Sequence, residues 1–273
     1  MTLAPIPQPL DPTRYRTAWA HYEQGRVPYA AALIRRVAEV TGLGSQHRVL
    51  DLGCGPGPLA RRFAPLAREV MAMDPTPEML AAARTLAGEA KNITFVAGSS
   101  YDLSPALGRF HLVVMGRSFH WMDRVDTLKR LNQIVEPAGA IALFHDTAPA
   151  VPANAWRKVL YEISARYEPK EGSHQTDPDW IRHEAVLLDS PFARLERFGV
   201  IERRALDVET LVQRTLSMGS TSPSHLGEEN TAAISAEIRA ALADVREEVV
   251  ETSALVAWRV GEESLTRFAR TMR

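Results

Sequence analysis

The feature that most constrains this chain is a glycine-rich turn between an apolar segment and a helical pattern. The sequence V-L-D-L-G-C-G-P-G occupies residues 49–57, and a helical pattern starts at Leu59. A strand, a glycine turn and a helix form the unit that binds nucleosides at the carboxyl end of a parallel strand. Glycines lack Cβ atoms, so this turn can be tight and its backbone can lie against a ligand. We expect Asp51 to accept hydrogen bonds from ligand groups or from N–H groups of the turn.

An acidic residue follows at the place where such a unit binds a ribose. A second apolar segment, residues 69–73, ends at Asp74, about 20 residues after Asp51. A carboxylate there accepts hydrogen bonds from both ribose hydroxyls, and the site then rejects analogues that lack them. The alternative is that Asp74 only caps the next helix, because Pro75 and the residues after it look like a helix start. We favour the ribose role.

Strand and helix patterns alternate along most of the chain. This alternation predicts an α/β fold with a doubly wound, mostly parallel sheet. The strands are expected at 48–52, 69–73, 93–97, 110–115, 141–144, 195–205 and 249–260, the last of them antiparallel. We divide the chain into an N-terminal arm with lid helices (1–44), a cofactor-binding core (45–146), and a C-terminal half of the sheet with helices that cover the acceptor pocket and the ligand edge (147–273).

Several motifs of the 45–145 region resemble one family. D-L-G-C-G-P-G at 51–57 resembles the first motif of class I S-adenosylmethionine-dependent methyltransferases. G-x-x-F-H-W-x-D at 116–123 resembles a loop of the small-molecule group known as methyltransferase type 11, which includes trans-aconitate-type enzymes. Glu136-Pro137-Ala138-Gly139 is close to the family's K-P-G-G turn. The resemblance implies a seven-stranded Rossmann-like fold, S-adenosyl-L-methionine as cofactor, and methyl transfer to a small molecule.

The resemblance carries a set of cofactor contacts, with two departures. The family often has an acidic adenine contact where this chain has Ser99, so Ser100 and Tyr101 are the alternative adenine contacts. His111 stands where the family has aspartate, and we interpret it as structural because it lies at a strand's start. The residues expected to bind the cofactor are Asp51, Gly53, Cys54, Gly55, Gly57, Asp74, Pro75, Met79, Ser99, Ser100, Tyr101, Gly116, Arg117 and Ser118.

Aromatic residues before the glycine turn suggest a lid. Tyr15, Trp19 and Tyr22 recur on one face of a predicted helix, which either covers the cofactor or packs on the core. Arg26 is either a contact for the cofactor's methionine carboxylate or a solvated surface residue. We expect Tyr15, Trp19, Arg117 and Trp121 to contact the acceptor.

Two histidines are candidate general bases. His120 follows the fourth strand and His145 ends the fifth, so both could face the transferred methyl group. Imidazole titrates near neutrality and suits proton removal from a hydroxyl or amine. The alternative is that His120 and Trp121 only shape the pocket. A carboxylate acceptor needs no base, and Arg117 then becomes a candidate anion contact.

Composition excludes several classes of partner. The net charge is −1 with no basic block, which argues against a nucleic-acid partner. One cysteine cannot form an intramolecular disulfide, which fits a cytoplasmic protein. No apolar run reaches the roughly 18 residues of a membrane span, and residues 1–12 lack the basic start of a secretion signal. No metal-ligand spacing is visible. We expect a monomer or homodimer with a small-molecule acceptor, and no membrane partner.

Two other functions stay open. A nicotinamide-dependent oxidoreductase shares the glycine turn and the acidic ribose residue, but the spacing here is G-x-G-x-G rather than G-x-G-x-x-G. A non-catalytic sensor or partner-binding protein could keep the cofactor fold, and Ser99 in place of the usual acid leaves room for it. A methyltransferase remains the leading interpretation.

Overall fold

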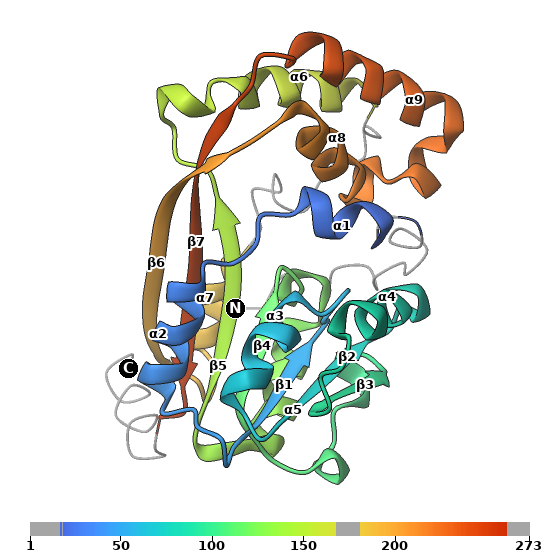
Figure 1. Cartoon of the computed structure of the whole chain (residues 1–273). Helices are drawn as coiled ribbons and strands as arrows, with labels where there is room; N and C mark the ends of the chain where they lie inside the picture. Colours follow the sequence, from blue (N-terminus) through green and yellow to red (C-terminus); the bar gives the residue numbers. More distant parts are fainter. Residues whose placement is uncertain (1–16, 18, 168–180, 261–273) are drawn as a thin grey trace.

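A computed structural model describes residue 17 and residues 19–167 and 181–260 of the chain. Tyr15 therefore lies outside the described residues. Seven strands form one sheet in the order β3-β2-β1-β4-β5-β7-β6 (Figure 1). Neighbouring strands run parallel except for β7, which is antiparallel to both β5 and β6. The strands are β1 (Arg48–Leu52), β2 (Glu69–Asp74), β3 (Ile93–Ala97), β4 (Phe110–Gly116), β5 (Val135–Thr147), β6 (Arg194–Ala205) and β7 (Glu247–Trp258). The predicted α/β fold with its mostly parallel seven-stranded sheet is confirmed.

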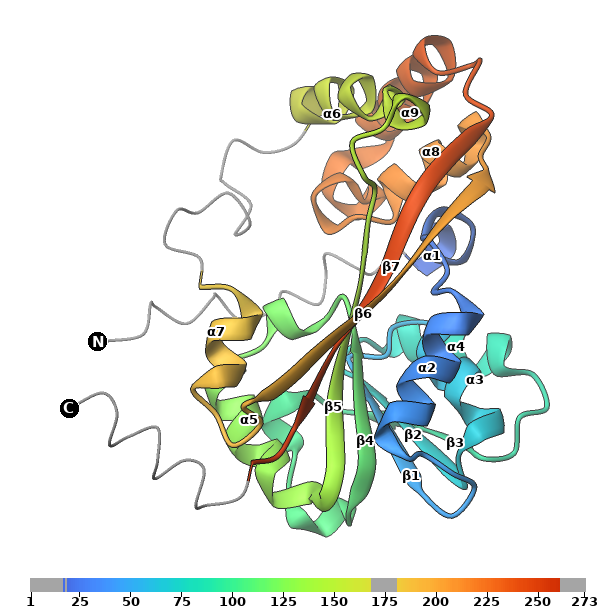
Figure 2. The same ribbon diagram turned by 90° about the vertical axis from the view of Figure 1, so that its left-hand side faces the viewer.

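The central strands are buried on both faces, which explains their near-continuous apolar sequences. Helices α2, α3 and α4 cover one face, and α5 and α7 cover the other (Figure 2). The strand order reverses between β1 and β4, which is where an open α/β sheet forms a ligand crevice. The helices are α1 (Trp19–Gly25), α2 (Ala31–Thr41), α3 (Pro58–Phe63), α4 (Pro77–Ala87), α5 (Arg124–Ile134), α6 (Trp156–Tyr167), α7 (His183–Leu188), α8 (Val208–Leu216) and α9 (Pro223–Ala241).

A group of helices, which we call the cap, lies beyond the carboxyl ends of the central strands. The cap consists of α6, α8 and α9, and α1 packs against α8 beneath it (Figures 1 and 2). The apolar side chains of the cap form their own hydrophobic cluster, separate from the two clusters that pack on the sheet. The cap cluster includes Trp156, Leu160, Leu211, Val212, Ile234 and Ile238. Strands β5, β6 and β7 are twelve or thirteen residues long and extend beyond the ends of the other strands to the cap.

The largest difference from the predicted strand bounds is at the fifth strand. The sequence predicts a turn at 136–140 before a short strand at 141–144, whereas the structure has one long strand, Val135–Thr147, with an irregular register opposite His111. Residues 145–147 extend the strand because they pair with β7, whereas residues 136–139 lie in the register shift between Val135 and Ala140 and have no partner in either neighbouring strand. Within the part of the chain that the structure describes, no helix combines the length and hydropathy needed to cross a membrane.

Candidate functional site

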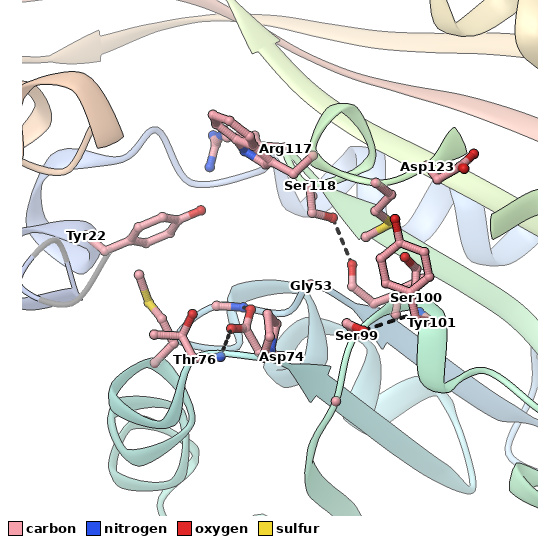
Figure 3. Close-up of a pocket in the computed structure, with 18 of the residues that line it drawn as sticks. Tyr22, Gly53, Asp74, Thr76, Ser99, Ser100, Tyr101, Arg117, Ser118 and Asp123 are labelled. Atoms are coloured by element: carbon pink, nitrogen blue, oxygen red, sulfur yellow. Dashed lines mark hydrogen bonds between the residues drawn. The ribbon is translucent and has the colours of Figure 1, made fainter. Parts of the chain in front are cut away.

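A cavity of about 310 Å³ lies at the carboxyl ends of β1, β2 and β4, where the strand order reverses. This volume is in the range of small-molecule sites. Most of the predicted cofactor contacts line it (Figure 3). The predicted acceptor contact Trp121 also lines it. The predicted residues on its wall are Gly53, Gly55, Asp74, Pro75, Met79, Ser99, Ser100, Tyr101, Gly116, Arg117, Ser118 and Trp121.

The glycine turn has the backbone that its sequence predicts. Gly53, Gly55 and Gly57 have φ angles of 69°, 54° and 76°, which only glycine adopts without strain. A Cβ atom at Gly53 would lie 2.6 Å from the Cβ of Ser118, so this glycine permits close packing. A Cβ at Gly55 would meet nothing nearer than the Met79 sulfur at 4.0 Å, and both residues line the cavity. Gly55 therefore leaves space for a ligand against the backbone.

Asp74 forms a hydrogen bond with the glycine turn and also lines the cavity. Its Oδ2 accepts a hydrogen bond from the Gly55 N–H at 2.8 Å, and its Oδ1 accepts one from the Thr76 N–H at 2.9 Å. Burial raises the pKa of this carboxyl, although the two N–H groups oppose the shift. Each carboxylate oxygen can accept more than one hydrogen bond, so a ligand diol could add to these contacts. The N-cap residue of α4 is Thr76, so Asp74 does not cap this helix, and its contact with a ribose stays a prediction.

Asp51 lies behind the turn and is not part of the cavity wall. Its Oδ2 accepts a hydrogen bond from the Ala60 N–H at 2.9 Å, which holds the start of α3. Its Oδ1 is buried and has no hydrogen-bond partner among the described residues. Burial raises the pKa of Asp51 to about 7, and the Ala60 N–H only partly offsets this. Cys54 and Gly57 also lie outside the cavity wall. Cys54 packs in the core, where burial raises its pKa and keeps the thiol protonated.

In the loop after β3, the Ser99 side chain forms hydrogen bonds within the loop itself. Its hydroxyl donates to Asp102 Oδ2 at 2.9 Å and accepts from the Tyr101 N–H at 3.2 Å. Asp102 also accepts from the Ser99 N–H, which completes a capping box on a short 3₁₀ helix, Ser100–Asp102. The acidic residue of this loop thus holds the loop's own backbone, and Ser99, Ser100 and Tyr101 form the cavity wall.

The lid segment, residues 19–30, supplies the opposite wall. Tyr22 and Arg26 line the cavity, and Figure 3 shows the Tyr22 ring across from Ser100 and Tyr101. Arg26 Nη2 donates to the Ser217 carbonyl at 2.9 Å, but its Nε is buried without a hydrogen-bond partner among the described residues. Trp19 does not line the cavity and is 43% exposed, so its predicted acceptor contact stays a prediction.

Three arginines from distant elements hold the backbone of the lid segment. Arg214 of α8 donates to the Gly25 carbonyl at 2.9 Å, and Arg117 donates to the Val27 carbonyl at 2.6 Å. Arg204 of β6 donates to the Pro28 carbonyl at 2.8 Å. These contacts tie the segment to the cap, to the loop after β4 and to the sheet edge.

Arg117 is the residue with the most unusual backbone in the site. Its φ of 57° is the only positive value at a non-glycine position among the described residues. Such strain persists where surrounding contacts enforce it and is frequent at functional sites. Its guanidinium pairs with Asp146 and stacks 4.6 Å from the Tyr29 ring centre. Burial alone favours the neutral form of Asp146, yet Arg117 holds the pKa of that carboxyl below its ordinary value.

The two candidate bases are not on the cavity wall. His120 lies in a short 3₁₀ helix, Phe119–Trp121, with its ring 4.8 Å from that of Trp121. His145 is exposed on β5. Their catalytic role stays a prediction. Three further residues line the cavity and were not predicted as contacts: Leu52, Gly98 and Met122. Each of them adjoins or lies within one of the sequence motifs.

The chain is similar to several methyltransferases. A methyltransferase domain family matches residues 49–139. An uncharacterized methyltransferase of Mycobacterium tuberculosis is 26% identical over 214 residues, which is 78% of this chain and 80% of that protein. A malonyl-[acyl-carrier protein] O-methyltransferase of Enterobacter lignolyticus is 31% identical over 115 residues, 41% of this chain and 45% of the relative.

Solved structures agree with the fold. A putative type II methyltransferase from Anaeromyxobacter dehalogenans has a TM-score of 0.60 at 20% identity, covering 86% of this chain and 97% of that one. A methyltransferase from Geobacter sulfurreducens, solved with S-adenosyl-L-homocysteine, has a TM-score of 0.51 at 15% identity and covers 93% and 99%. Taken with the family match over residues 49–139 and the glycine turn, these findings support a class I S-adenosylmethionine-dependent methyltransferase.

Proposed function

We propose that this chain transfers the methyl group of S-adenosylmethionine to a small-molecule acceptor bound between the lid segment and the loop after β4. The observation that carries the proposal is the composition of the cavity wall. One side consists of the glycine turn and Asp74, and the other consists of Tyr22 and Arg26 from the lid segment. Trp121 lines the same cavity, so an acceptor there would lie beside the cofactor.

The cofactor fits the groups present. The open space at Gly55 accepts the methionine part, the Asp74 carboxylate accepts the ribose hydroxyls, and Ser99, Ser100 and Tyr101 flank the adenine. Arg26 Nε is a buried donor without a hydrogen-bond partner among the described residues, which suits the methionine carboxylate. Asp51 Oδ1 is also a buried acceptor without a hydrogen-bond partner among the described residues, and from behind the turn it could reach the ammonium group through water.

The bound cofactor supplies an electrophilic methyl group on its sulfonium. The chain's task is then to hold the acceptor's nucleophilic atom close and aligned, which is the contribution of proximity and orientation. Arg117 fixes the lid segment through Val27 and is itself neutralised by Asp146, so we assign it a positioning role rather than the anion contact. Among the described residues Arg26 forms no ion pair with a carboxylate, so it is the better anion contact.

The acceptor atom is an oxygen or a nitrogen in this proposal. A carboxylate is compatible with the site, because it needs no base and neither candidate histidine lines the cavity. The name of the Enterobacter lignolyticus relative, an O-methyltransferase of malonyl-[acyl-carrier protein], fits this option. A hydroxyl or amine acceptor would require His120 or another base to approach it.

The test is a screen of small carboxylates, phenols and amines, scored by S-adenosylhomocysteine release. Tyr22→Leu should lower turnover of the acceptor found, since Tyr22 lines the cavity. Trp19→Leu is the matched control, because Trp19 is on the same helix but outside the cavity. Cofactor binding without turnover of any acceptor class would favour the non-catalytic sensor. Unchanged turnover in Tyr22→Leu would remove Tyr22 from the acceptor site.

A further inference from the structure

Tyr29 is a buried tyrosine whose hydroxyl has no hydrogen-bond partner among the described residues. It lies near the end of the lid segment, and its side chain is only 3% exposed. Two neighbours fix its ring: the Arg117 guanidinium lies 4.6 Å from the ring centre, and the Phe144 ring meets it edge-on with centres 5.3 Å apart. An unpaired buried hydroxyl destabilises a fold, so this group calls for a functional explanation.

The Tyr29 hydroxyl lies directly behind the cavity wall. A Cβ atom at Gly116 would be 2.9 Å from Tyr29 Oη, and Gly116 lines the cavity. Asp51 is on the same face of the sheet as that absent Cβ, because Asp51 pairs with Val114 and positions two residues apart on a strand share a face. Val114 and Tyr29 belong to the apolar cluster on this face. Since Gly116 has no side chain, none stands between the hydroxyl and the cavity at this position.

Tyr29 and Asp51 carry complementary unpaired atoms. Tyr29 Oη can donate a hydrogen bond and accept others, whereas Asp51 Oδ1 is an acceptor that also lacks a partner among the described residues. Burial raises the pKa of Tyr29 although Arg117 opposes the shift, and the charge of Asp51 adds to it, so Tyr29 keeps its proton. The two atoms form no hydrogen bond with each other. A third polar group between them would therefore satisfy both.

We propose that Tyr29 and Asp51 form a subsite for the ammonium group of the cofactor's methionine part, which they bind through one shared water. The inference rests on the proposed function, since it takes S-adenosylmethionine to occupy the cavity. The water accepts hydrogen bonds from Tyr29 Oη and from the ammonium group and donates one to Asp51 Oδ1, which gives it about three hydrogen bonds, as is usual for buried water. Such a subsite discriminates against a ligand that lacks the amino group, because the polar groups built to bind it then lose a partner.

The experiment compares S-adenosylhomocysteine with its desamino analogue, in which hydrogen replaces the amino group, by calorimetric titration. Tyr29→Phe should weaken the binding of S-adenosylhomocysteine about three- to tenfold, the loss expected for one uncharged hydrogen bond. The affinity of the desamino analogue should stay within about twofold of the wild type, because the two changes remove the same interaction. Tyr167→Phe is the matched control, since it removes a tyrosine hydroxyl that bonds to Glu237 of the cap, away from the cavity wall. This control should bind both ligands as the wild type does.

The melting temperature of the ligand-free protein shows whether Tyr29→Phe folds. It should be no lower than in the wild type, because the substitution removes an unpaired buried hydroxyl and creates no new unpaired atom. Losses of similar size for both ligands, or unchanged affinity for S-adenosylhomocysteine, would overturn the inference, and Tyr29 would then act only in packing. Failure of the proposed function looks different: the wild type would bind S-adenosylhomocysteine and discriminate against the analogue, yet methylate no acceptor. A wild type that binds neither ligand would overturn both.

Discussion

Replacing Asp74 by alanine tests the ribose contact most sharply. In the structure this carboxylate accepts hydrogen bonds from the Gly55 and Thr76 N–H groups, at 2.8 and 2.9 Å, and lines the cavity. We propose that a bound cofactor adds its two ribose hydroxyls to these contacts. The variant thus loses hydrogen bonds to a charged acceptor and a support of the glycine turn.

The magnitude follows from these contacts. Hydrogen bonds to a charged group contribute about 1.5–3 kcal/mol each, less the cost of desolvating the carboxylate. Burial raises the pKa of Asp74, so the cost of desolvating its carboxylate offsets part of the binding free energy from these hydrogen bonds. We expect a net loss of about 2–3 kcal/mol in the binding of S-adenosylhomocysteine, which corresponds to a dissociation constant about 30- to 150-fold higher.

The assay is calorimetric titration with S-adenosylhomocysteine and with its 2′-deoxy analogue. The analogue should bind the wild type more weakly, and Asp74→Ala should discriminate far less between the two ligands, because the acceptor of that hydroxyl is gone. Glu69→Ala is the matched control, since this residue is at the other end of β2 and pairs with Arg48. Unchanged discrimination in Asp74→Ala would refute the ribose role, even if overall affinity fell.

Three other substitutions have separate expected outcomes. Cys54→Ala should retain most activity, because its buried thiol stays protonated; a dead variant with intact cofactor binding would contradict this. Burial raises the pKa of Asp51 to about 7, so the native state holds a proton that the unfolded chain releases near pH 4. The free energy of unfolding should therefore fall between about pH 4 and 7, and fall less in Asp51→Asn, as measured by urea titration. His120→Ala should lower turnover less than about tenfold at saturating cofactor; a loss of ~10²–10⁴ would identify it as the base.

The local motifs were predictable because adjacent residues determine them. Strands 48–52 and 93–97 have the predicted bounds, since an apolar run ends at a glycine in each. The positive φ angles at Gly53, Gly55 and Gly57 follow from the same spacing. Asp74 likewise ends its strand beside the turn, as its distance from Asp51 predicts.

Contacts between distant segments were not predictable from this sequence alone. Gly25 lets α1 approach α8 so closely that a Cβ there would lie 2.3 Å from the backbone nitrogen of Arg214. That approach helps to place Tyr22 and Arg26 on the cavity wall. The extension of β5 from the predicted 141–144 to Thr147 depends on its pairing with β7, more than 100 residues later in the chain.

The central claim is that the cavity beside the glycine turn binds S-adenosylmethionine. The most direct measurement is the affinity of S-adenosylhomocysteine for the wild type, Gly55→Val and Gly42→Val by calorimetric titration. Both glycines have positive φ, 54° and 66°, so both substitutions introduce backbone strain of the same kind. A side chain at Gly42 meets no atom within 4 Å and is remote from the cavity, whereas Gly55 lines the cavity. We predict one site per chain in the wild type and in Gly42→Val and no detectable binding in folded Gly55→Val; wild-type affinity in Gly55→Val would contradict the account.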